Sequence, residues 1–293
     1  MTPLPERKGS FIISIDYEYA WGLVDRELSP SDIARIREEV GITTRLIELF
    51  EHHRVPATWA IVGHLLEVGE HGEDTAWFDA RGLITRITAS SVGHEIGSHS
   101  YAHPLYGEID RESVKDDIGR AADIHKKHNL SFRSFVFPRN KEGHHDLLAD
   151  HGITSFRGLN RAWYHKLPYR LWPLGSGIDY WFPTAHTVIP TVHPSGLVNI
   201  PDSLAFLSRK GLKKLLPPFQ TIRKICHALD TAAKRGETFH LWFHPSNFSY
   251  STDTQFKIFH AVLAHAAELR DRRALDIVTM GEQASIFMNP HHE

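Results

Sequence analysis

The chain has 293 residues, of which 41% are hydrophobic and 23% charged, an ordinary composition for a folded globular protein. Its 33 Lys and Arg residues nearly balance its 35 Asp and Glu residues, so the formal net charge of −2 gives no overall attraction for a polyanion, and we expect no nucleic-acid partner. The single cysteine, Cys226, excludes an internal disulfide, and we find neither a signal-peptide-like apolar segment at the N-terminus nor an apolar run of membrane-spanning length; these features favour a protein of the reducing cytoplasm.

Short apolar runs rich in β-branched residues alternate with longer segments of helical period. Strands are expected at 10–16, 57–61, 94–98, 134–137, 153–157, 239–243 and 275–279. Amphipathic helices are expected at 29–53, 110–128, 142–151, 219–235, 254–270 and 281–288. Strands followed by helices predict an α/β fold, namely a distorted, incomplete (β/α) barrel of about seven strands with its chemistry at the carboxyl ends of the strands.

Residues 160–218 interrupt this alternation, because aromatic residues, glycines and prolines occur there without a clear period. A long irregular segment inside a compact domain is either functional or a sign that its elements have been assigned wrongly. We interpret the segment as a substrate-facing insertion in a single domain spanning 1–293. The alternative is a structural cover over the end of the barrel.

Residues 94–104 read HEIGSHSYAHP and place His99 and His103 four positions apart. One helical turn would put both imidazoles on the same face, where they could bind one metal ion. The chain has 22 histidines, so pairs at this spacing also arise by chance. The pair alone therefore leaves metal binding undecided.

The first expected strand ends in SIDYE, in which Asp16 and Glu18 point to the same side of an extended chain. Two such carboxylates repel each other unless a cation or a proton separates their roles, although they could also be solvated surface charges. If the strands are parallel neighbours, one carboxylate meets the two histidines at one edge of the sheet. Two imidazoles and a carboxylate suit Zn²⁺ or another divalent ion that also holds a water, and the second carboxylate is then free to act as a base.

Two further polar residues follow expected strands. Arg139 comes after the fourth, in SFVFPRN, and His244 after the sixth, in FHLWFHP. Each residue type alone is commonly structural or exposed. Their shared position at the ends of strands makes both candidates for the same site.

The ordered series SIDYE, HSYAH, FVFPRN and LWFHP resembles the motifs of the polysaccharide deacetylase family, also called the NodB-homology group or carbohydrate esterase family 4. The similarity extends over residues 10–245, and HSYAH is its most specific motif. The resemblance implies a metal-dependent hydrolase that removes an N-acyl group, acetyl or formyl, from a sugar or glycan intermediate. It also implies one divalent ion, which we expect to be zinc, with cobalt, nickel or manganese able to substitute.

Carried over by position, the resemblance makes Glu18, His99 and His103 the metal ligands. It makes Asp16 the general base that takes a proton from the metal-activated water, Arg139 the residue that orients this base, and His244 the general acid.

The chain departs from the family pattern in two motifs. The acidic pair is Asp-x-Glu instead of two adjacent aspartates, which is similar to the intracellular branch that acts on sugar intermediates. In the third motif, proline precedes arginine. Asp179, in GIDYWFP, is the candidate counterpart of the fourth motif.

The expected substrate is an N-acylated sugar met inside the cell: a nucleotide-sugar, a lipid-linked precursor or a glycan under assembly. Residues 208–224 interleave Lys and Arg with Leu and Phe. That pattern suits peripheral contact with a membrane, here the inner membrane surface, or with a phosphate group, and it is equally typical of a solvated helix face.

Two other functions remain open. A metal-independent amide or ureide hydrolase with the same barrel would not need His99 and His103. A catalytically silent glycan-binding barrel would not need Asp16 and His244. The presence of all four residues argues against both readings.

Overall fold

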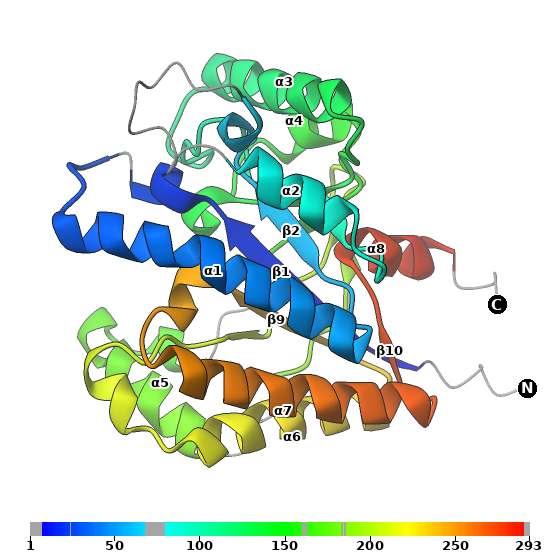
Figure 1. The fold of residues 1–293 in the computed structure, drawn as a ribbon. Coiled ribbons are helices and arrows are strands. Elements are labelled where there is room, and N and C mark those ends of the chain that lie inside the picture. The colour runs from blue at the N-terminus through cyan, green and yellow to red at the C-terminus, as the bar shows by residue number, and fades with distance from the viewer. Residues whose placement is uncertain are drawn as a thin grey trace, which may run out of the picture.

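The computed structural model describes residues 8–23, 25–67, 80–159, 163–182, 184 and 186–289. Through this part of the chain runs one ten-stranded sheet, curled and covered by helices on its outer side (Figure 1). Its strands are β1 (Gly9–Tyr17), β2 (Thr58–Ile61), β3 (Glu95–Ser98), β4 (Ser134–Val136), β5 (Ser155–Arg157), β6 (Thr191–Val192), β7 (Val198–Asn199), β8 (Leu204–Ala205), β9 (Thr238–Phe243) and β10 (Leu275–Ile277).

The strand order is β6-β7-β5-β4-β3-β2-β1-β9-β8, and β10 pairs with the first residues of β1. Every pair is parallel except β6 with β7. In the described residues no strand pairing joins β6 to β8, so the sheet is a half-barrel, which confirms the incomplete (β/α) barrel predicted from the sequence. All seven predicted strands are present. The three additional strands have two residues each, which is too short to give a periodic signal.

β1 is buried along its whole length because it has neighbours on both edges and is covered on both faces. Phe11, Ile13 and Ile15 belong to the main core, whereas Ile12, on the other face, packs in a cluster with Met280 of the last helix. A strand buried on both faces reads as a continuous apolar run, which is why this one is visible in the sequence.

The helices are α1 (Pro30–His53), α2 (Arg81–Thr88), α3 (Arg111–Lys127), α4 (His145–Asp150), α5 (Trp172–Trp181), α6 (Pro218–Arg235), α7 (Thr252–Asp271) and α8 (Met280–Met288). The six predicted helices are present with ends shifted by a few residues. α1 begins at the Ser29 cap, where Ser29 and Asp32 form a capping box, and stops at Arg54 in the left-handed conformation. Within the described residues, we find no helix that combines the length and the apolar content needed to cross a bilayer.

The prediction that 160–218 lacks regular structure is wrong for part of the segment, because α5, β6, β7 and β8 lie within it. Helix α5 has several large apolar side chains exposed, including Leu174, Ile178 and Trp181, so its sequence lacks the usual division into an apolar and a polar face.

Candidate active site

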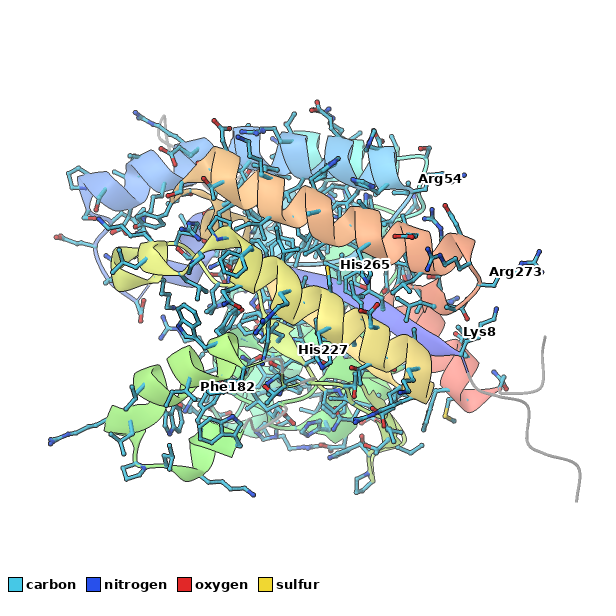
Figure 2. The ribbon with its side chains drawn as sticks, turned by 90° about the horizontal axis from the view of Figure 1, so that it is seen from below. Lys8, Arg54, Phe182, His227, His265 and Arg273 are labelled. Atoms are coloured by element: carbon cyan, nitrogen blue, oxygen red, sulfur yellow. The ribbon has the colours of Figure 1, made fainter. Side chains whose placement is uncertain are left out.

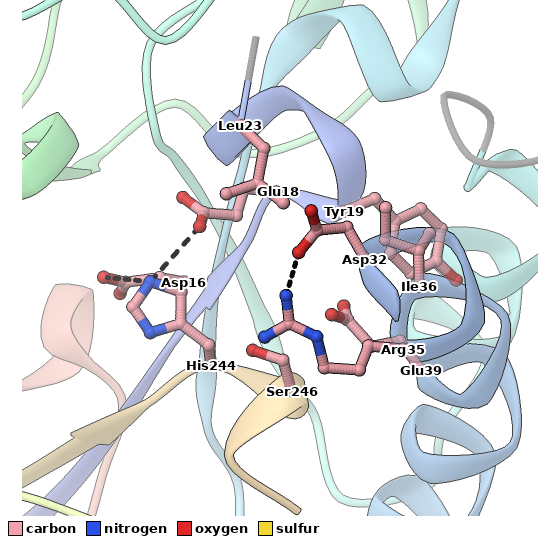
Figure 3. Close-up of a pocket in the computed structure, with 10 residues that line it drawn as sticks. All are labelled: Asp16, Glu18, Tyr19, Leu23, Asp32, Arg35, Ile36, Glu39, His244 and Ser246. Atoms are coloured by element: carbon pink, nitrogen blue, oxygen red, sulfur yellow. Dashed lines mark hydrogen bonds and ion pairs between the residues drawn. The ribbon is translucent and has the colours of Figure 1, made fainter. Parts of the chain in front are cut away.

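Parallel strands bring the predicted polar residues to one edge of the sheet. β1 is paired with β2 on one side and β9 on the other, and β2 is paired with β3. Asp16 and Glu18 therefore lie at the same edge as His99, which follows β3, and His244, which follows β9. Figure 3 shows His244 beside both Asp16 and Glu18, and all three side chains line a small cavity.

Glu18, His99 and His103 converge on one point. The Glu18 Oε2 atom is 2.9 Å from Nε2 of His103 and 3.4 Å from Nε2 of His99. Each of the three side chains offers one ligand atom, and these atoms all lie within 4.8 Å of one another. The separations between these ligand atoms are similar to those between atoms that each bind one shared ion at about 2.0–2.1 Å, so the three groups fit a single divalent cation.

A backbone contact sets the tautomer of His99. Its Nδ1 atom lies 2.8 Å from the carbonyl oxygen of Val136, and the ring is 1% exposed. A carbonyl can only accept, so Nδ1 donates its proton to Val136, and Nε2 is the ring atom directed toward Glu18. Support of this kind is typical of metal-binding histidines.

The segment from His99 to His103 is a turn, so a helical turn is not what brings the two imidazoles together. Ser100 and His103 both have left-handed backbone angles, with φ of 68° and 62°. The Ser100 hydroxyl accepts from the backbone N–H of His103, and the Asp117 carboxylate accepts from those of Tyr101 and Ala102. These side-chain acceptors replace the hydrogen bonds that a helix would have supplied.

The position of Glu18 depends on a close approach by Gly22, in the 3₁₀ helix η1 (Tyr19–Leu23). A Cβ atom on Gly22 would stand 2.1 Å from Glu18 Oε1. Only glycine leaves room for the carboxylate as it is placed here.

The histidines keep Glu18 ionised. Burial raises the pKa of this carboxyl, but His244, His103 and His99 together outweigh burial and hold the pKa well below its usual range. The carboxylate form is the form that a metal ligand needs.

Asp16 forms an ion pair with Arg157, the last residue of β5. Two parallel bonds join Nη1 to Oδ1 at 2.6 Å and Nη2 to Oδ2 at 2.7 Å, and the two side chains are 1% and 5% exposed. Burial raises the pKa of Asp16, and the Arg157 guanidinium more than offsets this, so the pKa lies below its usual value. Arg157 also bonds to Ser14 and Asn140 and lies over the Trp242 ring.

The structure corrects the prediction that Arg139 orients Asp16. Arg139 is nearly half exposed, has a left-handed φ of 49°, and donates to Asp25 at 2.7 Å. The chain turns at Pro138–Asn140 just after β4, which carries Arg139 toward solvent, whereas Arg157 is still within the sheet. Sequence reasoning missed Arg157, although alternation along the predicted strand at 153–157 places it on the same face as the buried Ser155.

His244 reaches both carboxylates. Its Nε2 atom lies 3.4 Å from Glu18 Oε1 and 3.8 Å from Asp16 Oδ2 (Figure 3), and the side chain is 30% exposed. The backbone N–H of His244 donates to Asn247, which fixes the turn after β9. The imidazole is thus within reach of both the buried carboxylates and solvent.

Two cavities adjoin these residues. One, of about 80 Å³, is lined by Asp16, Glu18 and His244 and has room for water but not for a sugar ring. The other, of about 590 Å³, is lined by Trp242 together with residues that follow β4 and β5 and residues of the 160–218 segment. Trp242 contacts both the Arg157 guanidinium and the His244 ring, so this larger cleft adjoins the carboxylate site.

Asp179, the candidate for the fourth motif, has other partners. It accepts from Lys224 and Thr184, lies 2.8 Å from Nε2 of His186, and is 2% exposed. Asp179 lines the large cleft, but none of its hydrogen bonds in the described residues joins Asp16 or His244. The network instead fastens α5 to α6.

A second group of potential ligands consists of His52, His53 and His260, with His53 Nε2 and His260 Nδ1 3.1 Å apart. It has no carboxylate and lies at the end of α1 far from the cavity, about 30 Å from the turn that holds Asp32. It is therefore separate from the site at the strand ends.

Known proteins resemble this chain in sequence and in fold. The family model described as polysaccharide deacetylase matches residues 32–153. A peptidoglycan deacetylase of Helicobacter pylori is 35% identical over 228 residues, which cover 72% of this chain and 68% of that protein.

Solved structures share the fold at low sequence identity. The structure described as a probable polysaccharide deacetylase from Pseudomonas aeruginosa has a TM-score of 0.66 and 13% identity, covering 97% of this chain and 92% of that one. The Puue allantoinase structure has the same TM-score and identity, with coverage of 99% and 93%. These structures show the fold alone, whereas the sequence relative and the family model establish that the chain belongs to the polysaccharide deacetylase family and is a hydrolase of the carbohydrate deacetylase type.

Proposed function

We propose that this protein is a metal-dependent N-deacylase that removes an acetyl or formyl group from the amino group of a sugar. The observation that carries the proposal is the convergence of Glu18, His99 and His103 within reach of a buried carboxylate, Asp16, and a partly exposed imidazole, His244. Amide hydrolysis needs a nucleophilic water, stabilisation of the oxyanion and a proton for the departing amine. Each need has a candidate group here.

Glu18, His99 and His103 would hold the metal, and we propose zinc because two imidazoles and one carboxylate with an open position form a common catalytic zinc site. A divalent ion bound there would lower the pKa of a water molecule and polarise the acyl oxygen. Glu18 is already ionised, and Nδ1 of His99 is occupied by the Val136 carbonyl, so Nε2 of His99 is the atom that would bind the ion.

Asp16 is proposed as the base. The two bonds from Arg157 fix its orientation and keep it ionised, so it can accept a proton from water. Arg157 acts through Asp16 and is therefore a positioning residue.

His244 is proposed as the acid that gives a proton to the leaving nitrogen. Its ring is 30% exposed, and its Nε2 atom lies 3.4 Å from Glu18 Oε1 and 3.8 Å from Asp16 Oδ2. Because the ring is open to solvent, it can be reprotonated after each turnover.

The large cleft is the proposed substrate site. Tyr164, Trp172 and Trp242 provide aromatic surface, and Asn140 and Asp202 provide hydrogen-bonding groups for hydroxyls. A volume of about 590 Å³ fits a sugar of one or two rings. The similarity to the Helicobacter pylori protein, a peptidoglycan deacetylase, supports an acetylated glycan or its precursor as substrate.

The fold alone does not determine which reaction is catalysed, because an allantoinase structure has a similar fold. What favours a metal-dependent reaction is the complete ligand set. What argues against a silent glycan-binding protein is that Asp16 and His244 lie beside this ligand set.

An amine-release screen over N-acetyl and N-formyl sugars, nucleotide-sugars and oligosaccharides tests the proposal. Activity should disappear after treatment with a chelator and return with zinc or cobalt. The matched variant is His103→Ala, which should lose the metal and the activity while keeping the fold. Turnover that is indifferent to chelation would contradict metal dependence and favour the metal-independent hydrolase.

A further inference from the structure

Large apolar side chains are exposed together on α5 and on the segment that leads into α6. Leu174, Trp181 and Phe182 belong to α5 and its C-terminal end, and Leu215 and Phe219 flank the start of α6. Phe182 is 61% and Leu215 69% exposed. We call these five residues the apolar face. An exposed cluster of this kind generally marks a binding surface.

The two parts of the apolar face are fastened together. Arg223 of α6 donates to the Trp181 carbonyl at 3.2 Å, and Lys224 donates to the Phe182 carbonyl at 3.4 Å and to the Asp179 carboxylate at 2.8 Å. Figure 2 shows Phe182 at the end of α5, beside α6. The buried Lys224–Asp179 ion pair therefore fixes the end of α5 against α6.

The charge of this region differs from that of the rest of the chain. Residues 163–224 contain eight Lys and Arg but only two Asp and Glu, whereas the remaining residues contain 25 and 33. Six of the eight cations are exposed, and none of these six has an ion pair among the described residues: Lys166, Arg170, Lys210, Lys213, Lys214 and Arg223. The two acids are engaged elsewhere, Asp179 with Lys224 and Asp202 with Trp242. The region has a net charge of about +6, in a chain that is otherwise acidic.

We propose that the apolar face and its exposed cations dock the protein on a bilayer rich in anionic phospholipid. Aromatic and aliphatic side chains enter the headgroup boundary, and the surrounding Lys and Arg contact lipid phosphates. A symmetric dimer through the same surface would place six cations opposite six cations, which disfavours a second copy as the occupant. The aliphatic residues Leu174 and Leu215 offer nothing to a nucleic acid.

Docking would hold the large cleft near the bilayer, because Tyr164, Trp172 and Asp179 line that cleft and belong to the same region. Resting on the proposed function, this placement suits a substrate sugar attached to a lipid. The docking itself does not depend on the activity.

Co-sedimentation of the full chain with two kinds of vesicle tests the proposal: phosphatidylcholine alone, and phosphatidylcholine with roughly one third phosphatidylglycerol. We expect binding to the second kind only, decreasing as salt is raised. Lys213→Ser with Lys214→Ser should weaken binding about 25-fold, since each cation near an anionic surface contributes about fivefold. Leu215→Ser with Phe219→Ser should weaken it at least roughly tenfold.

The matched controls lie on other faces. Lys126→Ser with Lys127→Ser in α3, and Ile286→Ser with Met288→Ser in α8, remove exposed residues of the same types and should leave vesicle binding unchanged. Circular dichroism of every variant checks that the fold is kept.

Three results would overturn the docking proposal: no binding to anionic vesicles, equal binding to neutral vesicles, or equal loss in the controls. Light scattering that reveals a dimer abolished by the Leu215 and Phe219 substitutions would identify a second copy as the occupant instead. Vesicle binding in a protein that releases no amine from any sugar would refute the proposed function and leave the docking intact.

Discussion

Replacing Arg157 with methionine should cost both stability and turnover. The substitution removes both bonds to Asp16, at 2.6 and 2.7 Å, and leaves a carboxylate that is 5% exposed without its counter-charge. Breaking a buried ion pair from one side costs about 3–5 kcal/mol. Burial then acts on Asp16 without the opposing guanidinium, so its pKa rises and a larger fraction becomes protonated and unable to act as a base.

Two other variants distinguish the effect of losing the positive charge beside Asp16 from the effect of losing the orientation of its carboxylate. Arg157→Lys keeps the charge but loses the planar fork and its further contacts with Ser14, Asn140 and Trp242, so we expect both stability and turnover to lie between those of the wild type and Arg157→Met. Arg139→Met removes a surface pair with Asp25, which is worth about 0–1 kcal/mol, and Arg139 also lines the large cleft, so we expect little change in stability and an effect on KM but not on turnover.

Urea unfolding gives the stability change, steady-state kinetics gives turnover, and elemental analysis checks that each variant still binds metal. The reasoning is refuted if Arg157→Met keeps wild-type turnover, or if Arg139→Met loses turnover while Arg157→Met does not. The second outcome would restore Arg139 as the residue that orients the base.

The metal site, the acid and two buried histidines can each be tested by one further experiment. Gly22→Ala should keep the fold but weaken metal binding, because the added methyl displaces Glu18. In the control Gly41→Ala, nothing lies within 4 Å of the added atom, so metal binding should be unchanged. Calorimetric zinc titration of both variants measures the affinity for the metal. His244→Ala should keep the metal and lower the turnover of an N-acyl sugar far more than that of an activated aryl ester, whose leaving group needs no proton; equal losses would exclude the acid role. Burial lowers the pKa of both His94 and His125 to about 4, so as the pH falls from about 6.5 to 4 the unfolded chain binds two protons that the folded chain does not. The free energy of unfolding should therefore drop by up to about 2.7 kcal/mol per pH unit over this range. Urea unfolding at pH 7 and pH 5 measures the drop, and equal free energies at the two pH values would contradict the prediction.

Sequence alone located much of the fold because the central strands are buried on both faces. The sequence of β1 is largely an apolar run, and the Ser29 capping box marks the first turn of α1. Neither α2 nor α5 was predicted. α2 has only eight residues, and the apolar residues of α5 are exposed, so neither helix had a clear periodic signal.

The sequence also determined which residues meet at the candidate active site. Asp16, Glu18, His99 and His244 each lie at or just after the carboxyl end of a strand, and the parallel pairing of the strands brings such positions to one edge of the sheet. This part of the prediction depends only on the order and direction of the strands.

Tertiary structure alone decided which arginine pairs with Asp16. Arg139 and Arg157 both lie at the ends of predicted strands, and no local pattern distinguishes them. The choice depends on the left-handed turn at Arg139, which directs that side chain toward Asp25, and on the register of β5, which directs Arg157 inward across the sheet. A contact between residues 141 positions apart depends on the packing of several strands together, and one segment of sequence does not encode it.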